Sequence, residues 1–119
     1  MKKIEAIIRE SKFQNVKTAL TKLGVRGMTT YPVRGRGDQI GEGGYEDVSY
    51  GGSSEQVFDD GLIAKRKIEI VCIKEEVNKI VNSIAINANT GDPGDGKIFV
   101  SDISDVIRIR TEEHGQVAI

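Results

Sequence analysis

The chain of 119 residues lacks the features that would place it in a membrane or in an oxidising compartment. It has a single cysteine, Cys72, so no disulfide can form within the chain. No apolar run approaches the roughly 20 residues that a membrane-spanning helix needs. The N-terminus, MKKIEAII, carries Glu5 and lacks the long apolar stretch of a secretory signal. Together these absences predict a cytoplasmic protein that is not embedded in a membrane.

The chain also lacks the residues that several function classes require. Its 17 Lys and Arg are balanced by 18 Asp and Glu, and a net charge of −1 argues against nucleic-acid binding. Cys72 lies in the apolar run IEIVCI, which favours a core position over a nucleophile. The only histidine, His114, has no Cys or His neighbour, so no metal site is expected. Without a positioned general base or paired histidines, we do not expect an enzyme.

Two similar halves organise the chain. The stretches KIEAII at 3–8 and KIEIVC at 67–72 are near-copies, and an amphipathic helix pattern follows each of them. Strand-like stretches come after the helices, at about 28–36 and 97–103. The order β-α-β-β-α-β predicts one α+β domain over residues 1–119, with a ferredoxin-like antiparallel sheet.

Local signals predict where the elements begin and end. Ser11 and Gln14 have the spacing of a capping box at the start of the first helix. Gly24 and Gly91 follow the last apolar positions of the two helices and are expected to close them. Pro32 cannot donate a ladder hydrogen bond, so the second strand is expected at the sheet edge.

A glycine-rich stretch, TGDPGDGKIFV at 90–100, separates the second helix from the strand that follows. Glycine lets a backbone approach a ligand closely, and successive N–H groups in such a loop can bind an anion. Gly91, Gly96 and Lys97 have Walker A spacing, but Ile98 stands where that motif needs Ser or Thr, so a P-loop NTPase is rejected. A phosphate loop over about 90–97 and a plain Gly-rich turn both remain open from the loop alone.

Two arginines follow in the C-terminal segment, at about 105–119. Arg108 and Arg110 have the spacing of one strand face, which predicts a short C-terminal strand and positive charge directed at a polyphosphate.

The stretch from Asp38 to Ala64 has a composition unlike the rest of the chain. It contains no Lys or Arg, seven acidic residues and six glycines, which makes it too polar to pack as core. Loops of this length in a small domain are usually functional, although a plain solvated linker is the alternative. We interpret about 37–64 as a long flexible arm that a partner or ligand orders.

Six ordered blocks of the sequence together resemble the PII signal-transduction proteins: MKKIEAIIR at 1–9, VRGMT at 25–29, GRGDQIG at 35–41, KRKIEIV at 65–71, TGDPGDGKIFV at 90–100 and VIRIRT at 106–111. The resemblance covers the chain except for the acidic arm and the last few residues. It implies a homotrimer that regulates nitrogen and carbon metabolism, with the arm as the family's T-loop.

The resemblance also implies a site for adenine nucleotides, ADP or ATP and in one interpretation AMP, in each cleft between subunits. In that family the matching loop and C-terminal stretch surround the phosphates, and the base of the arm approaches them. The residues that the resemblance assigns to this site are Ile7, Thr29, Gly35, Gly37, Asp38, Gln39, Lys65, Glu69, Val71, Gly94, Asp95, Gly96 and Lys97 from one chain, and Arg108 and Arg110 from its neighbour.

Several positions depart from the family pattern. Asp38 stands in place of an arginine, Ile40 in place of a lysine, and Asp92 and Pro93 in place of a Lys-Ile pair. Added negative charge near a γ-phosphate predicts a preference for fewer phosphates. Gln39 and Lys65 match the residues that handle 2-oxoglutarate together with Mg-ATP, so a magnesium contact at Gln39 is implied only in that complex.

These departures lead to a main hypothesis and its alternatives. The main hypothesis is a divergent PII-like adenylate sensor that regulates a membrane transporter through its acidic arm. The first alternative is a conventional nitrogen regulator that senses ATP with 2-oxoglutarate and controls an ammonium channel or a metabolic enzyme. A bicarbonate-linked sensor, a slow nucleotide hydrolase using Asp38 and a purely structural trimer are further alternatives. Tyr45 and Tyr50 do not match the family's modification context, so uridylylation is not predicted.

Overall fold

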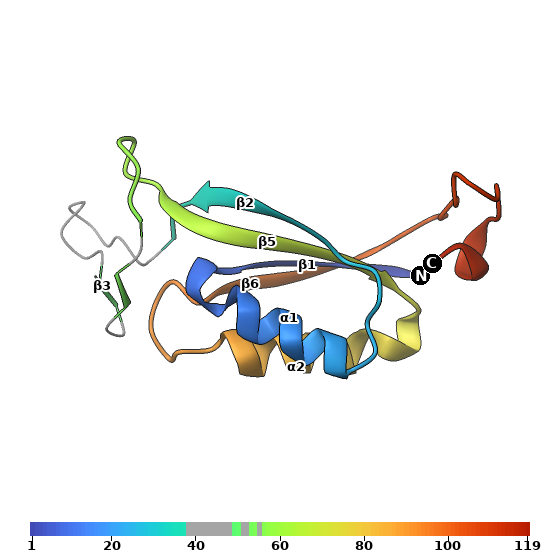
Figure 1. Ribbon diagram of the computed structural model, residues 1–119, viewed down its shortest axis with the longest axis horizontal. Coiled ribbons are helices and arrows are strands. Elements are labelled where there is room, and N and C mark those ends of the chain that lie inside the picture. Colours follow the sequence, from blue (N-terminus) through green and yellow to red (C-terminus); the bar gives the residue numbers. More distant parts are fainter. Residues whose placement is uncertain (38–48, 51–52, 55) are drawn as a thin grey trace.

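The main body of the molecule is a four-stranded antiparallel sheet with two helices on one face (Figure 1). The computed structural model describes residues 1–37, 49–50, 53–54 and 56–119. The strand order is β2-β5-β1-β6. The bounds are β1 Lys2–Arg9, α1 Phe13–Lys22, β2 Thr29–Gly35, β5 Ile63–Cys72, α2 Val77–Ala88 and β6 Gly96–Asp102. In the arm, β3 (Ser49–Tyr50) pairs with β4 (Ser53–Ser54).

Alternation along the strands divides the sheet into a covered face and an open face. In β1 the side chains of Ile4, Ala6 and Ile8 are buried beneath the helices, whereas the residues between them point to the other side. Strand β5 repeats this pattern with Ile68 and Ile70. The apolar stripes of α1 and α2 cover these side chains, and together they form one core. The other face of the sheet has no helix against it in Figure 1.

The structure confirms the predicted β-α-β-β-α-β order and ferredoxin-like sheet. It also confirms that the strand containing Pro32, β2, lies at the sheet edge. Helix α1 ends as predicted at Gly24, which follows the helix in the left-handed conformation with φ of +92°. The N–H of Gly24 donates to Thr21 and the N–H of Val25 to Leu20, which is a Schellman motif.

Two predicted helix ends were wrong. The capping box is not formed: a 3₁₀ turn over Glu10–Lys12 leads into α1, and no side chain caps its first turn. Helix α2 ends at Ala88, and Asn89 is already extended with ψ of 129°. Gly91 therefore does not cap the helix; its φ of +89° bends the loop that follows.

The C-terminal segment forms a turn instead of the predicted short strand. Among the described residues, the strand-like pairing of this segment is limited to one isolated bridge, between Ile107 and His114. A 3₁₀ turn over Gly115–Ala118 follows. The carboxylate of Asp105 closes this turn, because it accepts from His114 Nδ1 at 2.8 Å and from the N–H of Gly115 at 3.1 Å. Figure 1 shows the segment projecting beyond the sheet, at the opposite end from the loop before β6.

The backbone of Gly96 lies close against the backbone of Ile7 in the neighbouring strand β1. Its φ is +103°, and a Cβ there would lie 1.7 Å from the carbonyl oxygen of Ile7. We expect Gly96→Ala to lower the free energy of unfolding by about 3 kcal/mol or more, because overlap adds to backbone strain. Gly91→Ala is the matched control, since φ is +89° but nothing lies within 4 Å. It should cost about 1–2 kcal/mol. Urea unfolding at one protein concentration measures both, and equal losses would contradict the steric argument.

Candidate functional site

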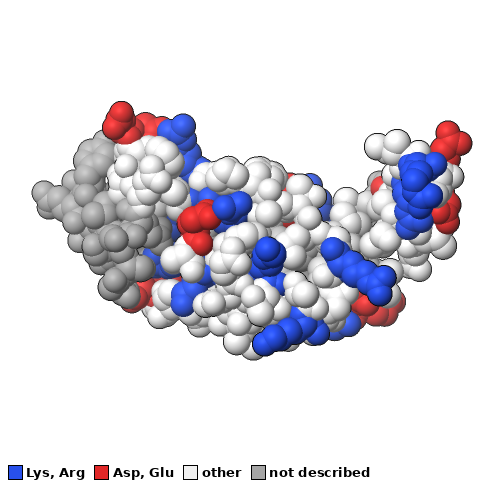
Figure 2. All heavy atoms as spheres, in the orientation of Figure 1, with Lys and Arg blue, Asp and Glu red and all other residues white. Residues whose placement is uncertain are grey.

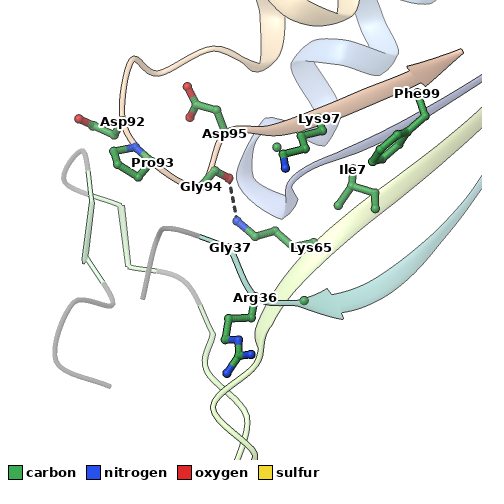
Figure 3. Close-up of a pocket in the computed structure, with 12 residues that line it drawn as sticks. Ile7, Arg36, Gly37, Lys65, Asp92, Pro93, Gly94, Asp95, Lys97 and Phe99 are labelled. Carbon is green, nitrogen blue, oxygen red and sulfur yellow. Dashed lines mark hydrogen bonds between the residues drawn. The ribbon is translucent and has the colours of Figure 1, made fainter. Parts of the chain in front are cut away.

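The loop before β6 forms one wall of a cavity of about 490 Å³ on the open face of the sheet (Figure 3). Its other walls come from the end of β2 with the base of the arm, from β5 and from β1. Four segments far apart in the sequence therefore meet around one space. The lining residues are Ile7, Gly35, Arg36, Gly37, Lys65, Asp92, Pro93, Gly94, Asp95, Gly96, Lys97 and Phe99.

Asp95 organises the loop from within. One carboxylate oxygen, Oδ2, accepts from the N–H groups of Thr90 at 2.8 Å and Gly91 at 3.0 Å. The other, Oδ1, accepts from the hydroxyl of Thr90 and from Arg9 Nε at 3.0 Å. Both oxygens are thus occupied by donors that the loop and β1 supply. The carboxylate therefore fixes the loop, and the Arg9 guanidinium partly offsets its charge.

These contacts set the pKa of Asp95. Burial alone would raise the pKa of this carboxyl, but the hydrogen bonds from Thr90, Arg9 and Gly91 outweigh burial and lower the pKa to about 2. The side chain is 24% exposed, so solvent screens the interaction only in part. Asp95 is therefore ionised at every physiological pH.

Two buried cations hold the carbonyl side of the same loop. Arg9 is fully buried, and its Nη2 donates to the carbonyl of Pro93 at 2.7 Å. Lys65, 7% exposed, donates from Nζ to the carbonyl of Gly94 at 2.8 Å (Figure 3). Arg9 and Lys65 are directly opposite each other in the β1–β5 register. Two adjacent loop carbonyls are thus held by a pair of cations from two neighbouring strands.

The residues expected around adenine and ribose lie farther along the open face. Thr29 pairs with Glu69 across β2 and β5, and neither lines the cavity, nor does Val71. Glu69 and Val71 alternate on the same face as Lys65, four and six residues along β5. Glu69 accepts from the hydroxyl of Tyr31 at 2.9 Å. Only Ile7 of this group lines the cavity.

The two C-terminal arginines do not reach the cavity within one chain. Arg108 donates to Glu113 Oε1 at 2.8 Å and to the carbonyl of Val117 at 2.8 Å, and Arg110 lies exposed in the turn. Figure 1 places their segment at the far end of the molecule, and Figure 2 shows it carrying both positive and negative side chains. Asp38 and Gln39 lie outside the described residues.

Known proteins match this chain along nearly its whole length. The family model described as nitrogen regulatory protein P-II matches residues 1–113. The chain belongs to the PII family. Nitrogen regulatory protein P-II 1 of Methanothermobacter thermautotrophicus is 49% identical over 119 residues, which cover all of this chain and 97% of that protein. Nitrogen regulatory protein P-II of Nostoc punctiforme is 44% identical, with both chains fully covered.

A solved structure agrees with the fold. The crystal structure of Arabidopsis thaliana PII bound to citrate has a TM-score of 0.76 and 42% identity, covering 99% of this chain and 91% of that one. The alignments run through the acidic arm, which the resemblance read from the sequence did not cover. Relatives that carry the conventional P-II name at this identity favour the nitrogen regulator over the divergent PII-like group. As PII proteins are regulatory signal transducers, the expectation that the chain is not an enzyme agrees with the family.

The structure brings two residues to the cavity or its supporting loop that the sequence did not indicate. Arg9 supports the loop from behind, and Phe99 lines the cavity from β6 with about half of its surface exposed. No local sequence signal marks Arg9, because its contacts are to loop residues more than eighty positions away. Among the described residues, no group of three or more His, Cys, Asp or Glu could hold a metal ion, and no helix is long and apolar enough to span a membrane.

The low pKa of Asp95 predicts a pH dependence of stability. The carboxyl has a pKa of about 2 when folded and 3.8 ordinarily, so its ionisation stabilises the fold above about pH 4, and this contribution is lost as the pH falls toward 2. The difference corresponds to about 2 kcal/mol. We expect Asp95→Asn to be less stable than wild type by this amount at pH 6, and the gap to close toward pH 2.

Urea unfolding between pH 2 and 7 measures this gap. Asp92→Asn is the control, because Figure 3 shows the Asp92 side chain pointing away from the loop interior. A gap for Asp95→Asn that stays constant over this pH range would show that the carboxylate charge is not what stabilises the loop.

Proposed function

We propose that this chain is a nitrogen regulatory PII protein that binds an adenine nucleotide in the cavity and signals the bound state to a partner protein through its arm. The observation that carries the proposal is the convergence of predicted phosphate-binding residues on one space. Residues of the loop, the base of the arm and β5, predicted from scattered sequence blocks, line a single cavity. The cavity lies on the open face, where a ligand can enter.

The chemistry of the cavity suits a phosphorylated ligand. Lys97 and Lys65 supply ammonium groups. Gly94, with φ of +104°, has no side chain where the loop borders the cavity. Ile7 and the ring of Phe99 supply apolar surface beside them. Apolar walls with a few placed cations are the usual composition of a nucleotide site.

The incomplete site supports assembly into a homotrimer. Arg108 and Arg110 lie at the opposite end of the chain from the cavity, so only a second copy can bring them to it. The C-terminal segment also exposes large apolar side chains, with Ile109 94% exposed between the two arginines. Burying such side chains in an interface removes apolar area from water. Residues 1–119 are proposed to form one domain of this trimer.

The effector is proposed to be ATP with 2-oxoglutarate, as in the conventional alternative, with magnesium held by the nucleotide phosphates and Gln39. Lys65 borders the cavity, so an effector carboxylate bound beside the phosphates lies within its reach. The adenylate-only sensor remains the second candidate, because Asp92 lines the cavity and adds negative charge at its rim. That acid favours ADP or AMP over ATP.

The arm is proposed to contact a basic surface of a cytoplasmic partner. Its seven acidic residues and lack of Lys and Arg suit the Lys/Arg-rich cytoplasmic loops of a transporter or channel, or a basic face of a metabolic enzyme. The base of the arm is attached to the sheet through Arg34, which stacks on the Phe58 ring at 4.5 Å and pairs with Asp60 at 3.2 Å. A change at the cavity edge at Gly35–Gly37 is therefore adjacent to the start of the arm.

Calorimetric titration with ADP and with ATP tests nucleotide binding. We expect wild type to bind both and Lys97→Ala to bind them about tenfold or more weakly, because a charged hydrogen bond to a phosphate is lost. Lys79→Ala is the matched control, since Lys79 lies on α2, on the covered side of the sheet, and pairs only with Glu76 among described residues. The absence of any adenylate binding by wild type would sink the proposed function.

A titration with 2-oxoglutarate separates the two candidate functions. In the conventional regulator, Mg-ATP and 2-oxoglutarate each raise the affinity of the other by the same factor. We expect 2-oxoglutarate binding in the presence of Mg-ATP and none with ADP. Tight ADP binding with no response to 2-oxoglutarate under any nucleotide would instead establish the adenylate-only sensor.

A further inference from the structure

Arg9 is a fully buried cation that touches the phosphate loop but does not line the cavity. It occupies the last position of β1, on the open-face register of the sheet. Its guanidinium makes two contacts on the loop, to the carbonyl of Pro93 at 2.7 Å and to Asp95 Oδ1 at 3.0 Å. A buried arginine is rare because its charge must be fully compensated. Part of that compensation comes from the loop itself.

The contact to Pro93 controls the direction of the loop's amide groups. A peptide unit is planar and trans, so its C=O and the following N–H point in opposite directions. When Arg9 holds the carbonyl of Pro93, it also fixes the direction of the N–H of Gly94. Lys65 does the same for the next peptide unit by holding the carbonyl of Gly94 at 2.8 Å. Gly94, with φ of +104°, has few other restraints on its conformation.

The contact to Asp95 completes the restraint from the other side. Arg9 shares this carboxylate with the hydroxyl of Thr90, and the N–H groups of Thr90 and Gly91 bind its second oxygen. The two ends of the loop are thereby tied to one guanidinium. Without it, Asp95 would keep its loop donors but lose its attachment to β1.

We propose that Arg9 is a positioning residue for the phosphate loop: it sets the orientation of the loop amides that receive the ligand's phosphates without touching the ligand. This inference rests on the proposed function. Arg9 thus contributes only to the part of the binding energy that comes from the ligand's phosphates. Loss of Arg9 leaves the apolar part of the cavity, Ile7 and Phe99, in place.

The test compares ADP with adenosine, which lacks phosphate, on wild type and Arg9→Met. Methionine keeps an unbranched side chain and removes the charge and both donors. We expect ADP binding by Arg9→Met to weaken about tenfold or more, as when charge-assisted bonds that order a site are lost, with adenosine binding unchanged. Arg9→Lys, which retains the charge and one donor at a time, should bind ADP with intermediate affinity.

Arg66→Met is the matched control. Arg66 lies on β5 opposite Ile8 and pairs with Glu10 at 2.6 Å, on the helix side of the sheet and away from the loop. It should leave both ligands unaffected. Because Arg9→Met removes one member of a buried pair, Thr90→Val is a second variant if folding fails. This variant removes the hydrogen bond from the Thr90 hydroxyl to Asp95. It should also weaken the binding of ADP and leave the binding of adenosine unchanged.

Each outcome decides between distinct claims. Wild type that binds neither ADP nor ATP rejects the proposed function. Wild type that binds ADP, with Arg9→Met or Thr90→Val binding it equally well, rejects the positioning role and leaves the function intact. Equal weakening for ADP and adenosine would show that Arg9 supports the fold in general, and this too rejects the proposal.

Discussion

The buried contact between the Arg9 guanidinium and the Asp95 carboxylate ties the end of the first strand to the loop before the last one. Breaking a buried ion pair is costly, because the remaining charge stays in a poorly solvated place. The pair therefore restrains a glycine-rich loop that its own sequence leaves free. Gly96 completes the restraint, since its backbone lies against Ile7 so closely that no other residue fits. A loop with three positive-φ glycines is thereby held in one conformation.

The division of the sheet into two faces explains why the site lies where it does. The helices bury one face with aliphatic side chains, and this face supplies the core. The open face carries paired charges. Two lysines, Lys3 and Lys67, each pair with both Glu5 and Glu69 on β1 and β5, at N–O distances of 2.7–3.8 Å. Each such exposed pair adds little stability. Their value is instead a polar surface on which a charged ligand or a second chain can bind without leaving an uncompensated group.

Periodicity was enough to predict the fold, because each element has a strong pattern of its own. The alternation in KIEAII and KIEIVC gives β1 and β5, and Pro32 alone was enough to place β2 at the edge. Local rules failed where longer contacts decide. The spacing of Arg108 and Arg110 suits a strand, but Asp105 and His114 close a turn around them. Asn89 ends α2 two residues before the glycine that the sequence indicated.

The loop and arm-base part of the site was predictable from glycine spacing and family resemblance, whereas its support was not. Nothing local marks Arg9, since its role depends on the β1–β5 register and on contacts to residues more than eighty positions away. Phe99 was likewise read only as part of a strand. The sequence shows which groups are present, and the register decides which of them share a surface.

Charge balance supports the proposal that the cavity of one chain is an incomplete binding site. Its lining carries three cations, Arg36, Lys65 and Lys97, against the two acids Asp92 and Asp95. Arg9 already offsets the charge of Asp95, so three cations in the lining face one remaining acid, Asp92. This excess of positive charge is still too small for a ligand with two or three phosphates. In the proposed trimer, Arg108 and Arg110 of a neighbouring copy would supply two more positive charges. A site that needs them links nucleotide binding to assembly, and by linkage each then stabilises the other.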